Sequence, residues 1–409
     1  MNLYMNSLFK ISLSFILLTI ISTSCSAIKT DARINTKSDL EIVNDKPKTE
    51  IKTGADNYNN YLPLLNNKQI GIVTNQTGIL SNKTHLVDFL LEKNIAIQKI
   101  FAPEHGFRGT ADAGEHIVDG KDSKTGLSII SLYGDNKKPK LEQLAGIDIM
   151  VFDLQDVGAR FYTYISSLHY IMEACAENKI ALLILDRPNP NGRTVDGPIL
   201  EKEFSSFVGM HPIPLLHGMT IGEYAQMING EQWLKNELQC KLTIIPCGNY
   251  NRKMNYSLPV KPSPNLPNDQ AVNLYASLCL FEGTNVSVGR GTENQFQIYG
   301  SPYLPKSDFS FTPKPNLGAQ NPVYNGVLCY GEDLSNYSRL NQLKLKWLIK
   351  AYQTTTDKSK FFNPFFTKLA GTKKLQQQIE AGISEDNIRE SWKQGLEAFK
   401  EMRKKYLIY

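Results

Sequence analysis

From Gln69 onward, short apolar runs alternate along the chain with longer amphipathic segments. This alternation is typical of a parallel sheet whose strands are connected by helices. The apolar runs predict strands at Ile70–Thr74, Ala96–Ala102, Leu127–Leu132, Asp148–Asp153 and Ile180–Leu185. The segments between them predict helices at His85–Lys93, Leu141–Ala145 and Ile165–Asn178. We therefore expect an α/β domain with a mostly parallel sheet.

The pattern changes after a predicted helix at Ile221–Asn229 and a predicted strand at Leu242–Ile245. The later sequence is richer in Pro and Asn and alternates less regularly. Within it we expect helices at Gln270–Leu280 and Asp386–Tyr406, the second of them amphipathic. This change in character indicates a second, smaller α+β auxiliary domain.

The folded part has about 350 residues, which is too many for one ordinary core. We place the boundary near Trp233–Cys240, between the α/β domain at residues 59–236 and the auxiliary domain at residues 237–409. Residues 26–58 are rich in Lys, Asp, Asn and Thr and poor in aromatic residues. Such a segment cannot bury enough apolar surface to fold, so we expect a flexible tether there.

The N-terminus predicts export. A single basic residue, Lys10, is followed by an apolar run, Ile11–Ile21, that is too short for a membrane span. The run ends in Ser22-Thr23-Ser24-Cys25, and small residues before a cysteine are typical of a lipoprotein signal peptide. We expect residues 1–25 to form this signal and Cys25 to be lipidated. The mature protein would then be anchored by lipid in the periplasm or at the outer membrane. Because Ser22 stands where the usual pattern has Leu, ordinary cleavage and free secretion stay an alternative.

The net charge limits the possible partners, and the cysteine positions limit the possible disulfides. The formal net charge of +5 is small for 409 residues, and no basic stripe with interleaved aromatic residues is present, so we expect no nucleic acid partner. Cys175 and Cys279 fall within apolar helical patterns and are predicted to be buried thiols. Cys240 and Cys247 are candidates for a disulfide in an oxidising compartment, which their spacing leaves open.

Candidate chemistry gathers in the loops after the predicted strands, where α/β sheets bind their ligands. Asn75 follows the first strand, and Pro103–Gly109 follows the second with Glu104, His105 and Arg108. Glu104 is our candidate for the key acid/base residue; the alternative is an ion pair between Glu104 and Arg108. Farther along, Glu115 is a second candidate carboxylate, unless its loop is simply solvated.

Two further clusters suggest sugar binding, because carboxylates and amides bind hydroxyl groups while flat rings cover sugar faces. The block Asp153–Tyr164 combines acids, one arginine and two tyrosines, although Asp153 is equally well explained as a helix cap or a buried partner. The glycine-rich block Phe281–Asn294 follows an apolar helix. The candidate residues of these two blocks are Asp156, Arg160, Tyr162, Tyr164, Glu282, Arg290 and Glu293.

Several chemistries are disfavoured. The six histidines lack metal-ligand spacing, so we expect no metal site, and His169 and His217 are best explained as structural groups. The chain has no Gly-x-Ser-x-Gly elbow, no P-loop and no Gly-x-Gly-x-x-Gly fingerprint. Esterase, nucleotide-hydrolase and dehydrogenase activities are therefore disfavoured, although a convergent catalytic triad stays open.

Taken together, these segments resemble the NamZ-type exo-β-N-acetylmuramidases, a bacterial family long classed as a domain of unknown function. The resemblance runs from about Tyr58 to Tyr409 and rests on many separate blocks. They include Gly71–Gly78, Pro103–Gly109, Asp153–Tyr164, Asp186–Pro190 with Gly197-Pro198, Pro214–Thr220, Pro264–Pro267, Glu282–Thr292, and Trp392, Phe399, Arg403 and Tyr406. This chain departs from the family pattern at Val288, where many relatives carry an acid before Gly-Arg-Gly.

The resemblance implies a Rossmann-like domain, an auxiliary C-terminal domain and a cleft between them for a terminal muramic acid residue. It also implies no organic cofactor. The expected activity is release of N-acetylmuramic acid from the non-reducing ends of peptidoglycan fragments, and the expected partners are muramic-acid-terminated fragments and, through the lipid anchor, a membrane.

Glycoside hydrolysis usually needs two carboxylates. The lactyl carboxylate of muramic acid would be matched by the planar fork of an arginine, for which Arg108, Arg160 and Arg290 are the candidates. We therefore predict Glu104 with Glu115 or Glu282 as catalytic residues. The predicted substrate-binding residues are Asn75, His105, Arg108, Asp156, Arg160, Tyr162, Tyr164, Arg290 and Glu293. The alternatives are a lipoprotein that binds cell-wall glycan without cleaving it, and an esterase or amidase.

Overall fold

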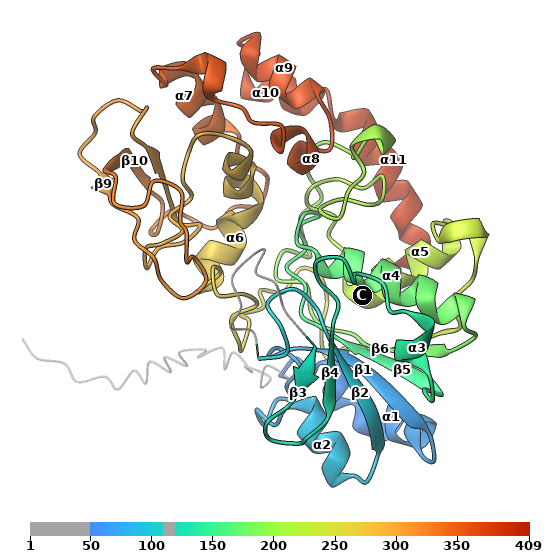
Figure 1. Cartoon of the computed structure of the whole chain (residues 1–409). Coiled ribbons are helices and arrows are strands. Elements are labelled where there is room, and N and C mark those ends of the chain that lie inside the picture. Colours follow the sequence, from blue (N-terminus) through green and yellow to red (C-terminus); the bar gives the residue numbers. More distant parts are fainter. Residues whose placement is uncertain (1–49, 109–118) are drawn as a thin grey trace, which may run out of the picture. The chain divides into compact units, whose positions relative to one another are not determined.

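The structure, a computed structural model, describes residues 50–108 and 119–409 (Figure 1). Cys25 and Glu115 lie outside these residues. The part of the chain described contains a seven-stranded sheet in the order β3-β4-β2-β1-β5-β6-β7, parallel except for β3. Its strands are β1 (Gln69–Thr74), β2 (Ala96–Ala102), β3 (Gly120–Lys121), β4 (Ser128–Ser131), β5 (Ile149–Asp153), β6 (Ala181–Leu185) and β7 (Leu242–Ile245). The expected parallel α/β sheet is confirmed.

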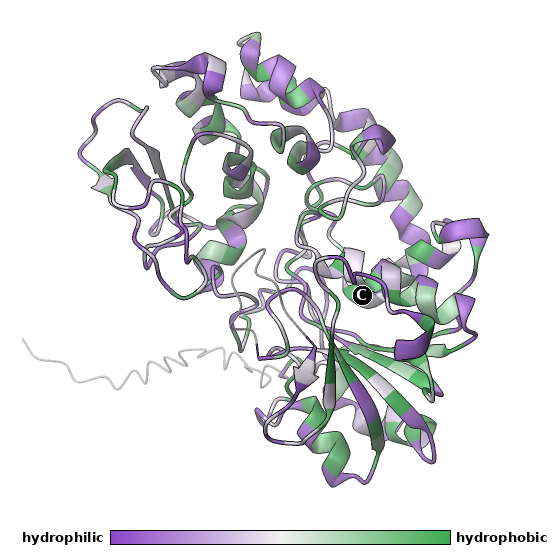
Figure 2. Ribbon diagram, viewed as in Figure 1, coloured by the Kyte–Doolittle hydropathy of each residue, from purple (hydrophilic) through white to green (hydrophobic). Residues whose placement is uncertain are grey.

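Helices cover both faces of this sheet because successive strand residues point in opposite directions. In β5, Val151 packs with α1 (Tyr58–Leu65) and α2 (Leu86–Glu92), whereas Met150 and Phe152 pack with the core of α4 (Tyr164–Glu177) and α5 (Ile221–Gly230). The short helix α3 (Leu141–Leu144) precedes β5. Figure 2 shows the central strands coloured largely as hydrophobic, as expected for a sheet covered on both sides.

The folded body begins before Tyr58, where we expected the tether to end. The backbone N–H of Gly54 donates to the Asp186 carbonyl at 2.7 Å, and Lys52 pairs with Gly248. A Cβ at Gly54 would lie 2.4 Å from the Ile245 carbonyl oxygen, so only glycine allows this close approach. Lys52 and Gly54, at the end of the expected tether, therefore contact the folded body, and the tether itself stays a prediction.

Beyond β7 the chain forms a smaller region with a three-stranded antiparallel sheet of order β8-β10-β9. Its strands are β8 (Ile298–Ser301), β9 (Ser310–Phe311) and β10 (Cys329–Asp333). The helices after β7 are α6 (Asp269–Leu278), α7 (Lys346–Thr354), α8 (Phe366–Ala370), α9 (Lys374–Glu380), α10 (Glu385–Glu390) and α11 (Lys393–Arg403). Since β7 pairs with β6, the large sheet extends past residue 236, the expected domain boundary. The division into two domains stays a prediction.

The expected helix Asp386–Tyr406 is interrupted between α10 and α11. The hydroxyl of Ser391 donates to the Ile388 carbonyl at 2.6 Å, which competes with the regular backbone hydrogen bonds of a helix. Trp392, the next residue, is buried and is the N-cap of α11. The side-chain hydrogen bond of Ser391 lies at the break between the two helices.

The cysteines that the structure describes are all buried free thiols. They include Cys240 and Cys247, which flank β7 and do not form a disulfide. None of the helices in the described ranges is long and apolar enough to cross a membrane.

Candidate active site

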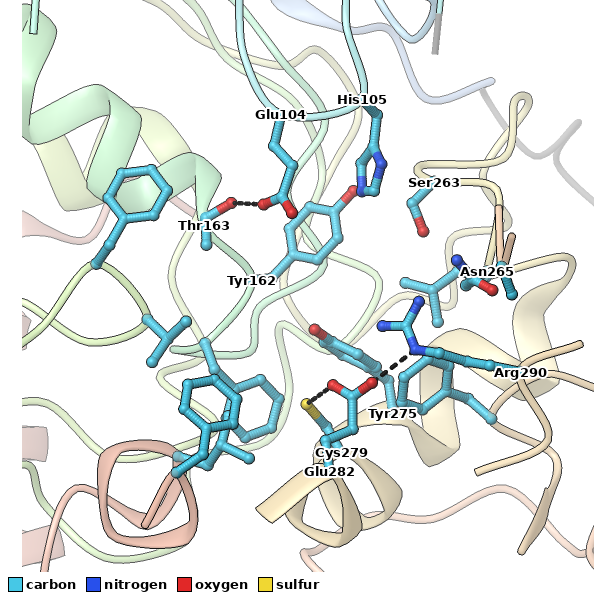
Figure 3. Close-up of a pocket in the computed structure, with 18 of the residues that line it drawn as sticks. Glu104, His105, Tyr162, Thr163, Ser263, Asn265, Tyr275, Cys279, Glu282 and Arg290 are labelled. Carbon is cyan, nitrogen blue, oxygen red and sulfur yellow. Dashed lines mark hydrogen bonds and ion pairs between the residues drawn. The ribbon is translucent and has the colours of Figure 1, made fainter. Parts of the chain in front are cut away.

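The loop after β2 brings Glu104 into a cavity. His105 and Gly106 both have positive φ, at 71° and 74°, which turns the chain sharply directly after Glu104. A left-handed backbone is unusual for a residue such as His105 and is often found at functional sites. The Oε2 of Glu104 accepts a hydrogen bond from the Thr163 hydroxyl at 2.8 Å, and Figure 3 shows this carboxylate directed into the cavity.

The loop after β5 supplies two aromatic walls. The rings of Tyr162 and Tyr164 pack edge to face with centroids 4.8 Å apart, and both line the cavity. The Tyr162 hydroxyl donates to the Pro262 carbonyl at 2.8 Å. The Tyr164 hydroxyl accepts from the side-chain amide of Asn75 at 2.7 Å. Asn75 is fully buried and does not line the cavity, so it supports Tyr164 from behind.

The carboxylates of Asp153 and Asp156 in this loop lie in the protein interior. Asp153 forms a two-point ion pair with Arg187, at 2.6 and 2.9 Å, which confirms it as a buried partner. Asp156 Oδ2 accepts from the Gly158 N–H at 2.6 Å, while Oδ1 has no hydrogen-bond partner among the described residues. Burial raises the pKa of Asp156 to about 7. Asp156 therefore does not present a carboxylate to the cavity.

Arg160 is fully buried and does not line the cavity either. Its guanidinium donates to four main-chain carbonyls at 2.7 to 3.0 Å, those of Pro198, Ile213, Leu369 and Ala370. These carbonyls come from the region before α5 and from α8. The structure therefore places Arg160, which we predicted to bind substrate, in the interior, where its two terminal nitrogens join distant parts of the chain and its Nε has no hydrogen-bond partner among the described residues.

The second acidic group of the cavity comes from the short helix Cys279–Gly283 after α6. Glu282 Oε1 forms an ion pair with Arg290 Nε at 2.6 Å, and its Oε2 accepts from the Cys279 thiol at 3.4 Å. Burial opposes the charge of Arg290, but the adjacent Glu282 more than offsets this and raises the pKa of Arg290. The guanidinium lies over the Phe296 ring, 5.1 Å from its centroid. Figure 3 shows the terminal nitrogens of Arg290 directed into the cavity.

The cavity formed by these loops is our candidate for the active-site cavity and has a volume of about 400 Å³. Six of our predicted residues line this cavity: Glu104, His105, Tyr162, Tyr164, Glu282 and Arg290. Other lining residues were not predicted, although Phe161 and Asn265 lie in the blocks Asp153–Tyr164 and Pro264–Pro267 that the sequence singles out. These unpredicted residues include Tyr133, Phe161, Phe207, Ser263, Asn265, Tyr275, Cys279, Phe296 and Phe365. The apolar aromatic positions of Phe161 and Tyr275 were indistinguishable from core positions.

The remaining predicted residues lie elsewhere. Arg108 pairs with Asp122 rather than with Glu104, and its guanidinium lies 4.4 Å from the Phe107 ring centroid. Glu293 lines a neighbouring cavity. His217 is buried 3.7 Å from Asp156, and burial lowers its pKa to about 3, so it is neutral at pH 7. Among the described residues, no group of three or more His, Cys, Asp and Glu side chains is placed to hold a metal ion.

A sugar-sized cavity with two carboxylates, an arginine and several aromatic rings defines the class of protein, a carbohydrate-active α/β protein. Comparisons with known proteins agree. The family models described as "Exo-beta-N-acetylmuramidase NamZ", N-terminal and C-terminal, match residues 70–270 and 273–409. The chain therefore belongs to the NamZ family of exo-β-N-acetylmuramidases and is a glycoside hydrolase.

Individual relatives are similar over most of their length. The "Peptidoglycan beta-N-acetylmuramidase NamZ" of Bacillus subtilis (strain 168) is 40% identical over 385 residues, which cover 88% of this chain and 92% of the relative. A crystal structure of a DUF1343 family protein from Bacteroides fragilis NCTC 9343 is 47% identical with a TM-score of 0.82, covering 88% of this chain and 99% of that one. A second such protein from the same organism is 27% identical with a TM-score of 0.73, covering 89% and 100%.

Proposed function

We propose that this chain hydrolyses the bond that links a terminal N-acetylmuramic acid to the rest of a peptidoglycan fragment. Membership of the NamZ family supports this activity, as does the 40% identical β-N-acetylmuramidase from B. subtilis. In this chain itself, the main support is that Glu104 and Glu282, from distant parts of the sequence, line one cavity of about 400 Å³. A cavity of this size suits one sugar residue and its substituents.

Glu104 is the proposed acid/base residue. Its carboxylate enters the cavity from a sharply turned loop, and the hydrogen bond from Thr163 fixes its orientation. Protonation of the glycosidic oxygen by a positioned carboxylic acid is the step that most glycoside hydrolases share. His105, which also lines the cavity, would position the substrate beside Glu104.

The second carboxylate is proposed to be Glu282 or Glu115. Glu282 is held by Arg290 and Cys279, which favours a fixed negative charge close to the developing positive charge on the sugar. Glu115 lies outside the described residues. Glu293 is less suitable because it lines the neighbouring cavity instead.

Arg290 is the proposed partner of the lactyl carboxylate of muramic acid. Of the three arginines predicted for this role, it alone lines the active-site cavity, whereas Arg108 pairs with Asp122 and Arg160 is buried. Because only Nε is used in the pair with Glu282, its terminal nitrogens can form the two-point contact that carboxylates favour.

The direct test is incubation with a disaccharide of N-acetylmuramic acid β-linked to N-acetylglucosamine, followed by chromatography of the products. We expect equimolar free N-acetylmuramic acid and N-acetylglucosamine. A protein that only binds glycan would leave the disaccharide intact while retaining it in a binding assay. Fragments with muramic acid only at the reducing end serve as the control, since an exo-acting enzyme must leave them uncleaved.

We also propose that the protein is exported and anchored by lipid at Cys25. The apolar run at residues 11–21, followed by small residues and Cys25, supports this placement. Acyl chains would supply the membrane affinity. A lipid anchor would hold the enzyme where cell-wall fragments are released.

A further inference from the structure

A second cavity lies beside the active-site cavity. Its volume is about 410 Å³, similar to the first, and Ser263 lines both. It is lined by Gln76 from the loop after β1, Lys261, Glu293, Asn316 and Leu317 among others. Two cavities of comparable size that share a wall residue suit two adjoining units of one ligand.

The shared wall, residues 261–265, is held from several sides. The side-chain amide of Gln76 donates to the Lys261 carbonyl at 3.1 Å, and Tyr162 donates to the Pro262 carbonyl at 2.8 Å. Asn265 donates to the Gly318 carbonyl at 2.5 Å. These bonds hold the wall against Gln76, Tyr162 and Gly318.

The chemistry of the second cavity matches an amino sugar. The side-chain oxygens of Gln76 and Asn316 are buried without a hydrogen-bond partner in the described part of the chain. A small rotation of either amide toward the cavity would let its oxygen accept from a hydroxyl or amide N–H donor of a ligand, which would satisfy its hydrogen-bonding capacity. Leu317, an apolar side chain that is 72% exposed, lies at the same cavity with Pro264 and Pro267. These apolar groups would cover a sugar ring face, while Lys261 and Glu293 would bind its polar edge.

We propose that the second cavity is the binding site for the sugar on the reducing side of the cleaved bond, an N-acetylated glucosamine unit. This inference rests on the proposed function. With the terminal muramic acid in the active-site cavity and the cleaved oxygen beside Glu104, the next ring must pass one wall of that cavity. Figure 3 shows His105 and Ser263 on the same side of the cavity as one another, and Ser263 is where the second cavity begins.

The test compares two substrates that differ only beyond the cleaved bond. One is the natural disaccharide, and the other is an aryl muramide, whose flat leaving group lacks the hydroxyls and acetamide of the second sugar. The variants are Glu293→Ala and Leu317→Ala. The matched controls are Glu142→Ala and Leu141→Ala on α3, because both are exposed and neither lies at either cavity; Leu141 is 68% exposed.

We expect each cavity variant to lower the ratio of kcat/KM for the disaccharide to kcat/KM for the aryl muramide by about tenfold, the loss that corresponds to about one hydrogen bond or a similar apolar contact. The control variants should leave this ratio at the wild-type value. A ratio that stays unchanged in Glu293→Ala and Leu317→Ala, whether the two rates fall equally or not at all, would overturn the assignment of this cavity. Failure of the proposed function itself would be distinguishable, since the wild-type protein would then release no muramic acid from either substrate.

Discussion

Glu104→Gln is the perturbation that tests the proposed mechanism most directly. Glutamine keeps the size of the side chain and still accepts the hydrogen bond from the Thr163 hydroxyl, so the loop should stay in place. It removes only the transferable proton. Loss of a positioned proton donor commonly slows a reaction about 10²- to 10⁴-fold, which corresponds to about 3 to 5 kcal/mol of barrier. We expect kcat for the disaccharide to fall by such a factor.

The assay follows release of N-acetylmuramic acid, while affinity for the sugar is measured separately by calorimetry. Binding should be largely preserved, because Arg290 and the aromatic walls are untouched. An aryl muramide with a very good leaving group should partly rescue the variant, since such a group departs almost without protonation. Glu142→Gln, an exposed substitution on α3, serves as the matched control. Near-normal turnover of the disaccharide by Glu104→Gln would refute the assignment and move the proton donor to another acid.

Four further outcomes are expected. Burial raises the pKa of Asp156 to about 7 from an unfolded value near 4, so the folded state keeps this proton longer and stability falls as the pH rises from about 4 through 7. In urea unfolding, the free energy of unfolding of the wild type should fall by up to about 4 kcal/mol across that window relative to that of Asp156→Asn. A difference in unfolding free energy between the two proteins that does not change with pH would contradict this. Arg160→Ala should lower the free energy of unfolding by about 3 kcal/mol or more, because four buried carbonyls lose their donor; a loss below about 1 kcal/mol would argue against this role. Cys25→Ser should block lipidation and release the protein from membranes, so unchanged fractionation would disprove the anchor. Activity should survive prolonged chelation, and loss that a particular divalent ion restores would overturn a mechanism based on carboxylates alone.

The sheet was predictable from the sequence because its strands are buried on both faces. Such strands form continuous apolar runs, as in Ile149–Asp153 and Ala181–Leu185, and their ends agree with the expected bounds to within a residue or two. The smaller region was less predictable. Its strand Cys329–Asp333 is only half-buried and short, and it lacks a clear two-residue alternation. The helix break at Ser391 was also missed, because no glycine or proline marks it in the sequence.

Part of the candidate site was predictable for a similar local reason. Glu104 directly follows a buried strand and is followed by a glycine-containing turn, so its position at the sheet edge could be inferred from the sequence. The different positions of Arg108 and Arg160 could not be inferred, because Arg108 pairs with Asp122 outside its motif and Arg160 with carbonyls far away in the chain, whereas Arg290 pairs with Glu282 inside its own block. Arg160 contacts Leu369 and Ala370, more than 200 residues later, and no local pattern indicates that contact.

The position of Arg160 also limits how the enzyme can exchange ligands. Its guanidinium connects the loop that contains Tyr162 with α8 through hydrogen bonds. Phe365, the residue before α8, lines the active-site cavity. Rotation of these parts away from each other would break charge-assisted hydrogen bonds and leave a cation in the protein interior without partners, at a cost of several kcal/mol. Turnover should therefore not require a hinge motion at this contact. Sugars would enter and leave without separating these two parts, so kcat should depend little on any opening at this contact.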